Sequence, residues 1–556
     1  MFYEIRLLFN MPEPITLMGG NQMSVLTVNA RYKHPNMSSE DWMTSDPVLL
    51  SGEVGYESDT GMSKIGDGTS KWSELKYIGA SVIPTNRVRF KVSVTSWDGK
   101  NVADRLVTVF SPGNSVTAKT ESNGEALIET DAGTWTISLS VPLQYNVPEM
   151  QIIEGVGGRQ TSVNFFMSEK TATVWTMTVD ESVSNPSDSV IYTGHCEGFQ
   201  PSYMDFANGV FVDNGWSARW PYTNMRPCLL KNRKLVDGTA QVMCYLNPND
   251  YTQDEDGTDV SQILSSGTDG GYDVDAMLEV SDIYYGYSNM ADQKIVTFKS
   301  VPSDDVYKTA YSYKGNVSNR FYVGMYAANE SQSKLRSLSG KTPSRRSLNE
   351  AITLARANGE GYEILNFYQT NLLLMLYLLR FKSLNSQTVL GMGPLKDSFD
   401  LFANGSMNTN GMNYGTSTEG PIKVNGIENF GAGRYWLIAG VKFNGTVMSL
   451  SDGDYLDQST WTSVNLETVP TSSGFMNKMQ WNDAVPFVPK ETSGSSSTYY
   501  SDYSDSASEY IVHGYPIDDI SQIERSGVFG YRFYNASTMG NSSFLSRLCY
   551  NGEVSQ

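Results

Sequence analysis

The chain has few of the residues that nucleophilic and metal chemistry use most often. Its 556 residues include four cysteines and three histidines, and no two cysteines form a CxxC pair. The cysteines and His195 match no structural zinc spacing, and His34 and His513 lack a nearby GxSxG motif. We therefore expect buried, unpaired cysteines, a reduced cytosolic site of synthesis, no resident cofactor and no enzymatic activity.

Positive charge is also scarce. The chain has 41 Lys and Arg against 60 Asp and Glu, which gives a net charge of -19 at pH 7. The one basic cluster that interrupts this surplus is Lys341–Arg346. Negative charge of this size repels phosphate backbones and anionic lipid surfaces, so we expect no nucleic-acid partner.

Long hydrophobic runs are missing as well. The longest strongly apolar stretch is Leu372–Leu379, which has eight residues, whereas a membrane-spanning helix needs about 20. The first residues, Met1–Phe9, place Glu4 early and lack the apolar core and cleavage site of a signal peptide. We expect no membrane insertion and no secretion by the signal-peptide route.

The composition is typical of strands and loops, with 49 Gly, 33 Tyr and only 18% charged residues. The length predicts several domains of about 100–200 residues each. Gly and Asp turns fill the end of 1–82, apolar and polar residues alternate over 86–181, and a polar linker covers 180–189. The block 187–556 mixes strands with helices. These patterns predict a multidomain, mainly β protein with a small N-terminal β domain, a β-sandwich and a C-terminal α+β domain.

Two helices are expected in the C-terminal block. Ser347–Glu350 has the spacing of a capping box, in which the serine caps the first turn and the glutamate reaches back to the cap amide. That helix should stop near Asn358. The second helix, about Ile364–Phe381, is apolar on nearly every side, so we expect it to be buried on most of its circumference.

An acidic loop could bind calcium. Asp254, Asp256 and Asp259 are closely spaced loop carboxylates of the kind that calcium prefers. The segment lacks the remote bidentate glutamate of an EF-hand. A solvated acidic turn without metal is the other interpretation.

A tyrosine-rich and serine-rich segment, Glu491–Tyr510, has the composition of a binding loop. Tyrosine offers a rigid face with a polar tip, while serine and glycine adapt their hydrogen bonds to a partner. Tyr499, Tyr500 and Tyr503 are its candidate contact residues, and a surface loop without a partner is the alternative. Further along, alternation puts Phe529, Tyr531 and Phe533 on one side of a strand and Arg532 and Tyr534 on the other.

The N-terminal region resembles a known domain. Gly52–Gly61, Lys64–Thr69, Trp42, Trp72 and Tyr77 are similar to the N-terminal domain of phage major tropism determinant proteins. That domain also occurs on tail fibres and phage hyaluronate lyases, where it serves assembly or attachment. The resemblance implies that 1–82 attaches the chain to other virion proteins.

The sandwich and the C-terminal block each carry a resemblance too. Residues 98–137 resemble prealbumin-like, immunoglobulin-type repeats, which are mostly spacers. Met225–Asn232, Tyr245–Tyr251, Ala355–Tyr362 and Ser546–Leu548 resemble phage tail-fibre and adhesin domains related to the C-type lectin fold and to formylglycine-generating proteins. The resemblance places these residues at a receptor-contacting surface: Tyr531, Arg532, Tyr534, Asn535, Ser537 and Asn541.

The departures from that family also carry information. The chain has no Glu-Pro-Asn or Gln-Pro-Asp triplet of calcium-dependent sugar binders, so sugar held through calcium is not expected. Only Cys549 stands where the oxidase branch needs a copper-binding pair. The recognition surface should therefore work without a metal.

The resemblances together imply a bacteriophage tail-fibre or spike subunit that recognises a host-cell surface glycan or protein. A homotrimer on the virion, made in the host cytoplasm, is the expected assembly. Two alternatives stay open. The chain could be a head fibre or decoration protein, or it could be a depolymerase of host polysaccharide, although no β-helix repeat or catalytic constellation is visible.

Overall fold

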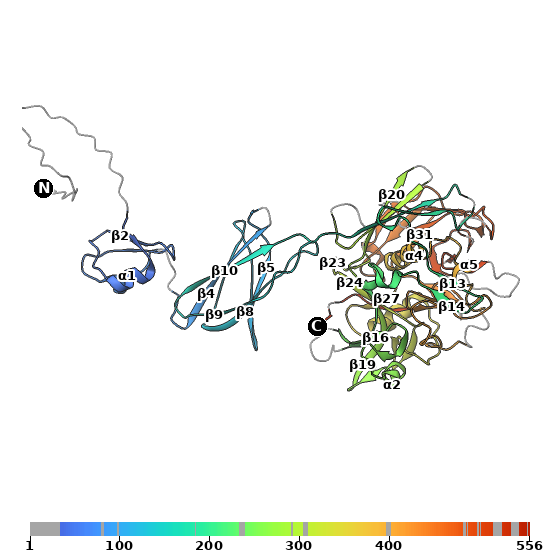
Figure 1. The fold of residues 1–556 in the computed structure, drawn as a ribbon, viewed down its shortest axis with the longest axis horizontal. Coiled ribbons are helices and arrows are strands. Elements are labelled where there is room, and N and C mark those ends of the chain that lie inside the picture. The colour runs from blue at the N-terminus through green and yellow to red at the C-terminus, as the bar shows by residue number, and fades with distance from the viewer. Residues whose placement is uncertain are drawn as a thin grey trace, which may run out of the picture. The chain divides into compact units, whose positions relative to one another are not determined.

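The computed structural model describes residues 34–555 with the exception of 79–82, 97–98, 184, 233–239, 291–292, 304–309, 396–401, 482–484, 486, 498–499, 501, 515–524, 535–543 and 553. The chain forms two compact units (Figure 1). One comprises Met1–Ser140 and Pro148–Phe166, and the other comprises Val141–Val147 and Met167–Gln556. The fold is mainly β, as predicted. No helix among the described residues is long and apolar enough to cross a membrane.

A small sheet with one helix begins the described chain. Strands β1 (Asn36–Met37), β2 (Val54–Glu57) and β3 (Ser63–Ile65) pair in that order. Helix α1 (Ser39–Ser45) and a short 3-10 helix (Trp72–Glu74) lie beside them. The buried rings of Trp42 and Trp72 stack with centroids 4.1 Å apart. Gly66 must be glycine, because a Cβ there would lie 2.3 Å from the carbonyl oxygen of Leu50. The predicted hairpin is β2–β3.

A β-sandwich follows, and it confirms the alternating pattern. One sheet has the order β10-β4-β7 and the other β6-β5-β8-β9. Their bounds are β4 Arg87–Ser96, β5 Leu106–Ser111, β6 Asn114–Lys119, β7 Glu125–Asp131, β8 Gly133–Leu139, β9 Gln151–Gly155 and β10 Gln160–Met167. Every second side chain of β4, from Val88 to Val94, is buried, as expected for a strand with one face on a core.

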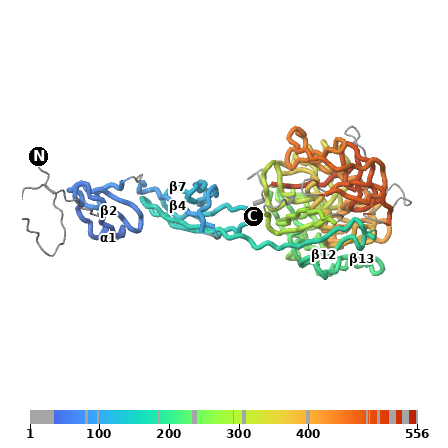
Figure 2. The backbone as a smooth tube through the Cα atoms, turned by 90° about the horizontal axis from the view of Figure 1, so that it is seen from above, coloured from blue at the N-terminus to red at the C-terminus, as the bar shows by residue number. Residues whose placement is uncertain are grey.

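One strand predicted for the sandwich belongs to the C-terminal unit instead. Strand β11 (Val174–Asp180) pairs with β12 (Val190–Thr193) and β21 (Gln293–Lys299). Figure 2 labels β12 on the C-terminal unit. The residues predicted as a polar linker therefore connect two paired strands. Glu181 among them is buried and accepts hydrogen bonds from the Met479 amide and the Tyr500 hydroxyl. The prediction placed β11 in the wrong sheet because the alternation of apolar and polar residues shows which face of a strand is buried but not which sheet the strand joins.

The C-terminal unit is built on a nine-stranded sheet whose main path is β17-β16-β15-β19-β24-β41-β27. Strand β41 comes from the last residues of the chain and lies between β24 and β27. The bounds are β15 Met225–Asn232, β16 Ala240–Asn247, β17 Asp250–Asp254, β18 Thr268–Asp269, β19 Tyr272–Ser281, β24 Arg320–Gly324, β27 Tyr362–Ile364, β41 Leu548–Tyr550 and β42 Val554–Ser555.

A second, six-stranded sheet has the order β34-β37-β39-β38-β30-β40. Its strands are β30 Tyr435–Leu437, β34 Gly474–Phe475, β37 Tyr503–Ser504, β38 Tyr510–His513, β39 Tyr531–Tyr534 and β40 Phe544–Leu545. Smaller sheets and hairpins complete the unit: β13 Tyr203–Asp205, β14 Val210–Val212, β20 Tyr284–Met290, β22 Ser312–Tyr313, β23 Asn316–Val317, β25 Asn329–Ser331, β26 Lys334–Arg336, β28 Lys423–Val424, β29 Ile427–Glu428, β31 Val441–Asn444, β32 Val447–Leu450, β33 Thr462–Asn465, β35 Lys478–Gln480 and β36 Val488–Glu491.

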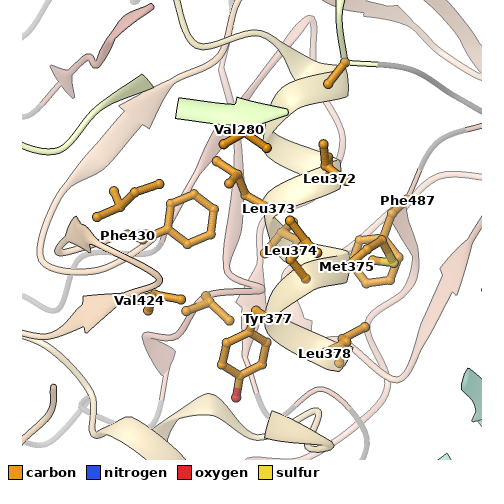
Figure 3. Close-up of a cluster of buried hydrophobic side chains, with 14 of the residues drawn as sticks. Val280, Leu372, Leu373, Leu374, Met375, Tyr377, Leu378, Val424, Phe430 and Phe487 are labelled. Carbon is orange, nitrogen blue, oxygen red and sulfur yellow. The ribbon is translucent and has the colours of Figure 1, made fainter. Parts of the chain in front are cut away.

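Both predicted helices are present. Helix α3 (Leu348–Arg356) starts with the predicted capping box between Ser347 and Glu350. Helix α4 (Phe367–Phe381) is buried on all sides, and its side chains share one buried cluster with Val280, Val424, Phe430 and Phe487 (Figure 3). It starts later than predicted, because Tyr362–Ile364 form β27. Two short helices, α2 and α5, lie at Ser261–Ser266 and Ser386–Leu390.

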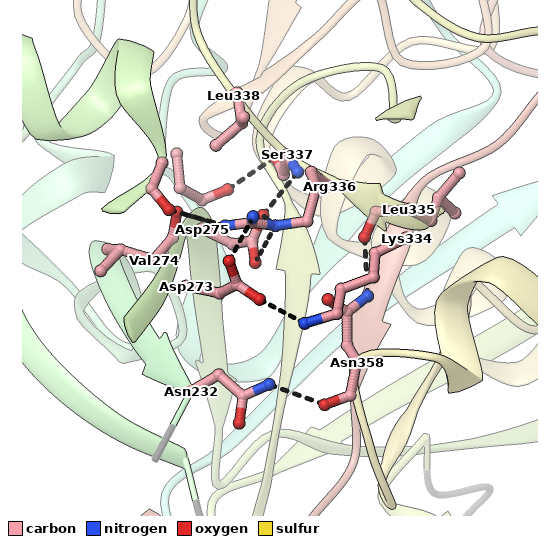
Figure 4. Close-up of polar contacts among 12 residues, drawn as sticks. Asn232, Asp273, Val274, Asp275, Lys334, Leu335, Arg336, Ser337, Leu338 and Asn358 are labelled. Carbon is pink, nitrogen blue, oxygen red and sulfur yellow. Dashed lines mark hydrogen bonds and ion pairs between the residues drawn. The ribbon is translucent and has the colours of Figure 1, made fainter. Parts of the chain in front are cut away.

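A buried ion-pair cluster fastens the β25–β26 hairpin to β19 (Figure 4). The guanidinium of Arg336 donates to both carboxylate oxygens of Asp275 at 3.1 Å and to Asp273 at 2.9 Å. Lys334 donates to the other oxygen of Asp273 at 2.6 Å. Because Arg336 and Asp275 are almost fully buried, the hydrogen bonds offset the unfavourable burial of their charges.

Candidate functional site

The candidate site is a cavity of about 770 Å³ in the C-terminal unit. Its walls come from segments that are far apart in the sequence, chiefly 209–227, 246–255 and 409–425, with one residue of α4. We call it the amide cavity, because asparagines are the most frequent of its lining residues. They line it together with arginines, carboxylates and apolar or aromatic side chains: Asn249, Asn410, Asn413, Asn425, Arg226, Arg380, Asp213, Glu255, Phe211, Tyr222, Met225, Leu246, Met412 and Tyr414.

Arg380 forms part of the cavity wall from the C-terminal turn of α4. It is buried and forms an ion pair with Asp213. Its guanidinium also donates to the Ser217 hydroxyl at 2.6 Å and to the Asn425 side-chain carbonyl at 3.0 Å. It lies 4.7 Å from the centre of the Tyr222 ring. These contacts connect α4 to two other segments of the lining, 209–227 and 409–425.

Two asparagines beside Arg380 have amide groups left over. The backbone N–H of Asn425 donates to the side-chain carbonyl of Asn413 at 2.8 Å, while the Asn425 carbonyl accepts from Arg380. Asn413 is only 3% exposed and Asn425 only 2% exposed. In the described part of the chain, the Nδ2 group of each has no hydrogen-bond partner. Leaving a buried donor without a hydrogen bond costs about 1–3 kcal/mol of stability. The two Nδ2 groups are therefore donors that could still bind an acceptor.

The rim of the cavity is an ion pair supported by an aromatic ring. Arg226 donates to both carboxylate oxygens of Glu255 at 2.9 Å. Its guanidinium lies 3.3 Å from the centre of the Tyr245 ring. Both charges are partly exposed, so the pair adds little stability but fixes the positions of a donor group and an acceptor group at the entrance.

Electrostatics keep the inner carboxylate ionised. Burial of Asp213 opposes ionisation, but Arg380 and the hydrogen bonds from Ser217 outweigh it and lower the pKa of Asp213. Behind the same wall, burial lowers the pKa of Lys423 to about 8. The Lys423 ammonium donates to the carbonyl oxygens of Met407 and Gly411 and so holds the loop that lines the cavity.

Two of the predicted receptor-contacting residues lie in the core. Tyr500 and Tyr531 are 0% exposed, and the Tyr500 hydroxyl donates to Glu181 at 2.7 Å. Because their rings are buried, they cannot contact a receptor. The prediction that these two tyrosines belong to the receptor-contacting patch is therefore wrong. The alternation of β39 explains Tyr531: it shares the buried face with Phe533, as predicted, and that face is the core.

Two other predicted residues reach the surface. Tyr503 is half-buried and packs edge-on against Phe475 at 5.4 Å. Arg532 is half-buried and forms an ion pair with Asp505 at 2.6 Å. The remaining members of the predicted patch cannot be placed: Tyr499, Asn535, Ser537 and Asn541, and the side chain of Tyr534, lie outside the described residues. Their contact with a receptor stays a prediction.

The tyrosine-rich and serine-rich segment contributes to a second depression, of about 760 Å³. Ser506–Glu509 line it together with 442–445 and 469–471. An ion pair between Lys442 and Glu509, 3.0 Å long, crosses it. This second depression has no unpartnered buried amide among its described lining residues.

The acidic loop is a set of capped turns. Asp254 accepts from the backbone amides of Asp256 and Thr258 at 3.0 and 2.8 Å, and Asp259 accepts from Ser261 at 2.9 Å. Within the described residues, no group of three or more His, Cys, Asp or Glu side chains is placed to hold a metal ion. The loop carboxylates thus accept hydrogen bonds from the backbone of their own turns.

The cysteines are unpaired: Cys196, Cys228, Cys244 and Cys549. Burial raises the pKa of the Cys244 thiol to about 11 and the pKa values of the other three further. Such thiols are poor nucleophiles at neutral pH, as expected for cysteines that act as small core residues.

Sequence reasoning missed the amide cavity. Two signals were present: Arg380 is the one charged residue in an otherwise uncharged helix, and Asn404–Asn413 is unusually rich in asparagine. Neither signal shows that these segments meet, because the 209–227 segment that completes the lining lies more than 150 residues before both of them in the sequence.

The comparisons with known proteins show a short region of sequence similarity to phage proteins. No family model matches the chain. The chain is 48% identical over 48 residues to a hyaluronoglucosaminidase of Streptococcus pyogenes phage H4489A, covering 9% of this chain and 13% of that protein. The corresponding protein of phage H10403 is 42% identical over 48 residues, covering 9% and 14%.

A solved structure, that of a full-length streptococcal bacteriophage hyaluronidase in complex with unsaturated hyaluronan octasaccharides, also shows a short match. It is 44% identical over 10% of this chain and 15% of that chain, with a TM-score of 0.09. This chain carries a segment shared with phage proteins. It spans only 13–15% of the length of these relatives, so their activity does not transfer with the segment.

The prediction that the chain is not an enzyme is wrong, because enzymatic activity is not excluded. The proteins that share its segment are hyaluronoglucosaminidases, so enzymatic activity is suggested, although the match covers only 48 residues. The physical reason is that glycoside hydrolysis needs only two carboxyl groups, which the fold brings together from distant positions. The lack of a local sequence motif with two such carboxyl groups therefore does not exclude glycoside hydrolysis.

Proposed function

We propose that the chain is a phage virion protein, a tail fibre or spike subunit, whose C-terminal unit binds a polysaccharide of the host surface in the amide cavity. The observation that carries this proposal is the cavity itself: about 770 Å³ with amides, arginines and aromatic side chains in one lining. Convergent polar groups in an apolar and aromatic cavity are typical of small-molecule and sugar sites. A protein receptor would need a broader, flatter surface.

The chemistry of the lining suits hydroxyl-rich ligands. Asparagine side chains both donate and accept hydrogen bonds, and Asn249 and Asn410 are accessible at the entrance. Tyr414 and Phe211 are half-buried and offer apolar ring faces to a sugar. The ion pairs of Arg380 with Asp213 and of Arg226 with Glu255 cancel their charges.

The N-terminal unit supports a place on the virion. Its sequence resembles an attachment domain of phage proteins, and the comparisons find a segment shared with phage enzymes. We propose that this unit joins the chain to other virion proteins and that the chain works as a homotrimer. Several copies on one particle would add their weak affinities through avidity. A head fibre is the alternative position, which immunogold labelling of the particle would distinguish.

The test uses the full-length protein and two single variants. Binding to polysaccharide purified from host cells, and to hyaluronan, is measured by titration calorimetry or by surface binding. We expect Tyr414→Ala, which removes an aromatic face of the cavity, to weaken binding at least about fivefold, equal to about 1 kcal/mol. Lys442→Ala, in the second depression, is the matched control and should bind normally. Equal binding by wild type and Tyr414→Ala would refute the proposal.

Cleavage of the bound polysaccharide is the second candidate function. The match to hyaluronoglucosaminidases favours it, and Asp213 and Glu255 line the same cavity. Two carboxyl groups about 5–9 Å apart would suffice for glycoside hydrolysis. Release of reducing or unsaturated ends from hyaluronan by the purified protein, abolished in Asp213→Asn or Glu255→Gln, would establish cleavage. Binding without any release would assign the cavity to recognition alone.

A further inference from the structure

We infer that the sugar unit bound in the amide cavity carries an acetamido group. This inference rests on the proposed function and deepens it, because it names the chemical group that the cavity recognises. Three features carry it: the orientation of two buried amides, the balance of charge around them, and the apolar side chains beside them.

The orientation of both amides is fixed by their own contacts. The side-chain carbonyl of Asn413 accepts the backbone N–H of Asn425, and the carbonyl of Asn425 accepts the guanidinium of Arg380. A flipped amide would point an N–H₂ group at each of these donors, which is unfavourable. The Nδ2 groups are therefore the free ends, and both are donors that require an acceptor.

The backbone makes Asn425 hard to replace. It has a φ of 47° in the turn between β28 and β29, a conformation that asparagine tolerates better than most residues. This residue and Asn413 are both at least 97% buried, and both line the cavity. Two unpartnered donors at one wall, among the described residues, match an acceptor that the protein itself does not supply.

The charge balance favours a neutral acceptor over a carboxylate or a sulfate. Arg380 is already paired with Asp213, and Arg226 with Glu255. Lys423, behind the same wall, is held by the carbonyl oxygens of Met407 and Gly411. A further buried anion would therefore lack a free cation to offset its burial. A carbonyl oxygen requires only N–H donors, and the two asparagine amides supply them.

The apolar neighbours suit a methyl group. Met225 and Leu246 are buried in the same lining, and Met412 is half-buried there. The Met412 methyl lies against Gly426, next to Asn425. Both Nδ2 groups are buried, so a ligand reaches them when a neighbouring side chain moves. Met412, beside Asn425, is unbranched and flexible. A carbonyl oxygen next to a methyl is the acetamido group, and a plain hydroxyl would leave the apolar side chains unused.

The experiment compares matched sugars on the full-length protein. Saturation-transfer NMR and calorimetry would measure N-acetylglucosamine against glucose and N-acetylgalactosamine against galactose. We expect at least one acetamido sugar to bind about tenfold more tightly than its parent sugar, equal to about 1.4 kcal/mol. Equal binding of each pair would overturn the inference and leave the proposed function standing. Failure of every sugar and of host polysaccharide to bind would overturn both.

One variant tests the amides directly. Asn425→Asp keeps an oxygen for Arg380 and a side chain that tolerates the positive φ, but it replaces the free donor with an acceptor. We expect it to lose the tenfold preference for acetamido sugars while its unfolding temperature stays close to that of the wild type. Lys442→Ala, at the second depression and outside the amide cavity, should keep the preference. A folded Asn425→Asp protein with unchanged preference would contradict the inference.

Discussion

Arg380 is the residue on which both the C-terminal core and the cavity depend. It is the one charged side chain in α4, and it is almost fully buried. Burying a cation is unfavourable unless its hydrogen bonds and a counter-ion offset the loss of water. Asp213, Ser217 and Asn425 provide these partners, and all three line the cavity.

Arg380→Ala should therefore destabilise the C-terminal unit strongly. Removing one member of a buried pair leaves the other charge uncompensated, and we expect the free energy of unfolding to fall by about 3–5 kcal/mol. Urea unfolding of the intact chain measures this change. Lys119→Ala is the control, because Lys119 is 65% exposed in its pair with Asp104, and we expect no measurable effect. An Arg380→Ala protein as stable as wild type would show that the pair is dispensable.

Glu363 makes stability depend on pH. Burial raises the pKa of Glu363 to about 7, although Arg356 opposes the shift through an ion pair of 2.7 Å. The side chain is 0% exposed. In the unfolded chain the carboxyl titrates near its ordinary pKa of 4.5. Between these two values the folded protein binds the extra proton, so the stabilising contribution is complete below about pH 4.5 and is lost as pH rises to about 7.

Glu363→Gln should remove this dependence. A glutamine keeps a carbonyl oxygen for Arg356 but cannot ionise. We expect the wild type to lose up to about 1.4 kcal/mol per pH unit relative to the variant across this window. Urea midpoints of both proteins at several values between pH 4.5 and 7.5 measure the difference. Parallel curves for the two proteins would mean that Glu363 does not titrate there.

At the scale of elements, helix α3 is held at its start by side-chain caps. The Ser347 hydroxyl accepts from the amide of Glu350, and the Glu350 carboxylate accepts from the amide of Ser347. Ser347→Ala should lower the free energy of unfolding by about 1 kcal/mol. Thr353→Ala on the exposed side of the same helix should cause no loss, because alanine is the better helix former. Thermal unfolding followed by circular dichroism compares the two variants.

Local elements were predictable where a local pattern determines them. The capping box and the apolar run predicted α3 and α4, and alternation predicted the buried face of β39. Sheet membership was not predictable, since β11 has the same alternation whether it pairs within the sandwich or with β21. Tyr500 was misplaced for a related reason. A tyrosine in a serine-rich segment has the composition of a contact residue, but the burial of its ring depends on packing from distant parts of the chain.

At the scale of the whole molecule, the mainly β, multidomain fold followed from composition and alternation, whereas the candidate site did not. The amide cavity joins segments near residues 213, 255, 380 and 425, and no spacing rule relates them. That the C-terminal unit is of the C-type lectin kind remains a prediction. The structure adds the amide cavity itself, and we propose that the recognition site lies there rather than over β39 and the second depression.

Hydrogen–deuterium exchange of the intact chain tests that placement most directly, with and without polysaccharide purified from host cells. We expect slower exchange in 209–227 and 409–425, which line the cavity, and unchanged exchange in 442–445 and 506–509 at the second depression. Protection confined to the second depression, or protection nowhere in the C-terminal unit, would contradict it.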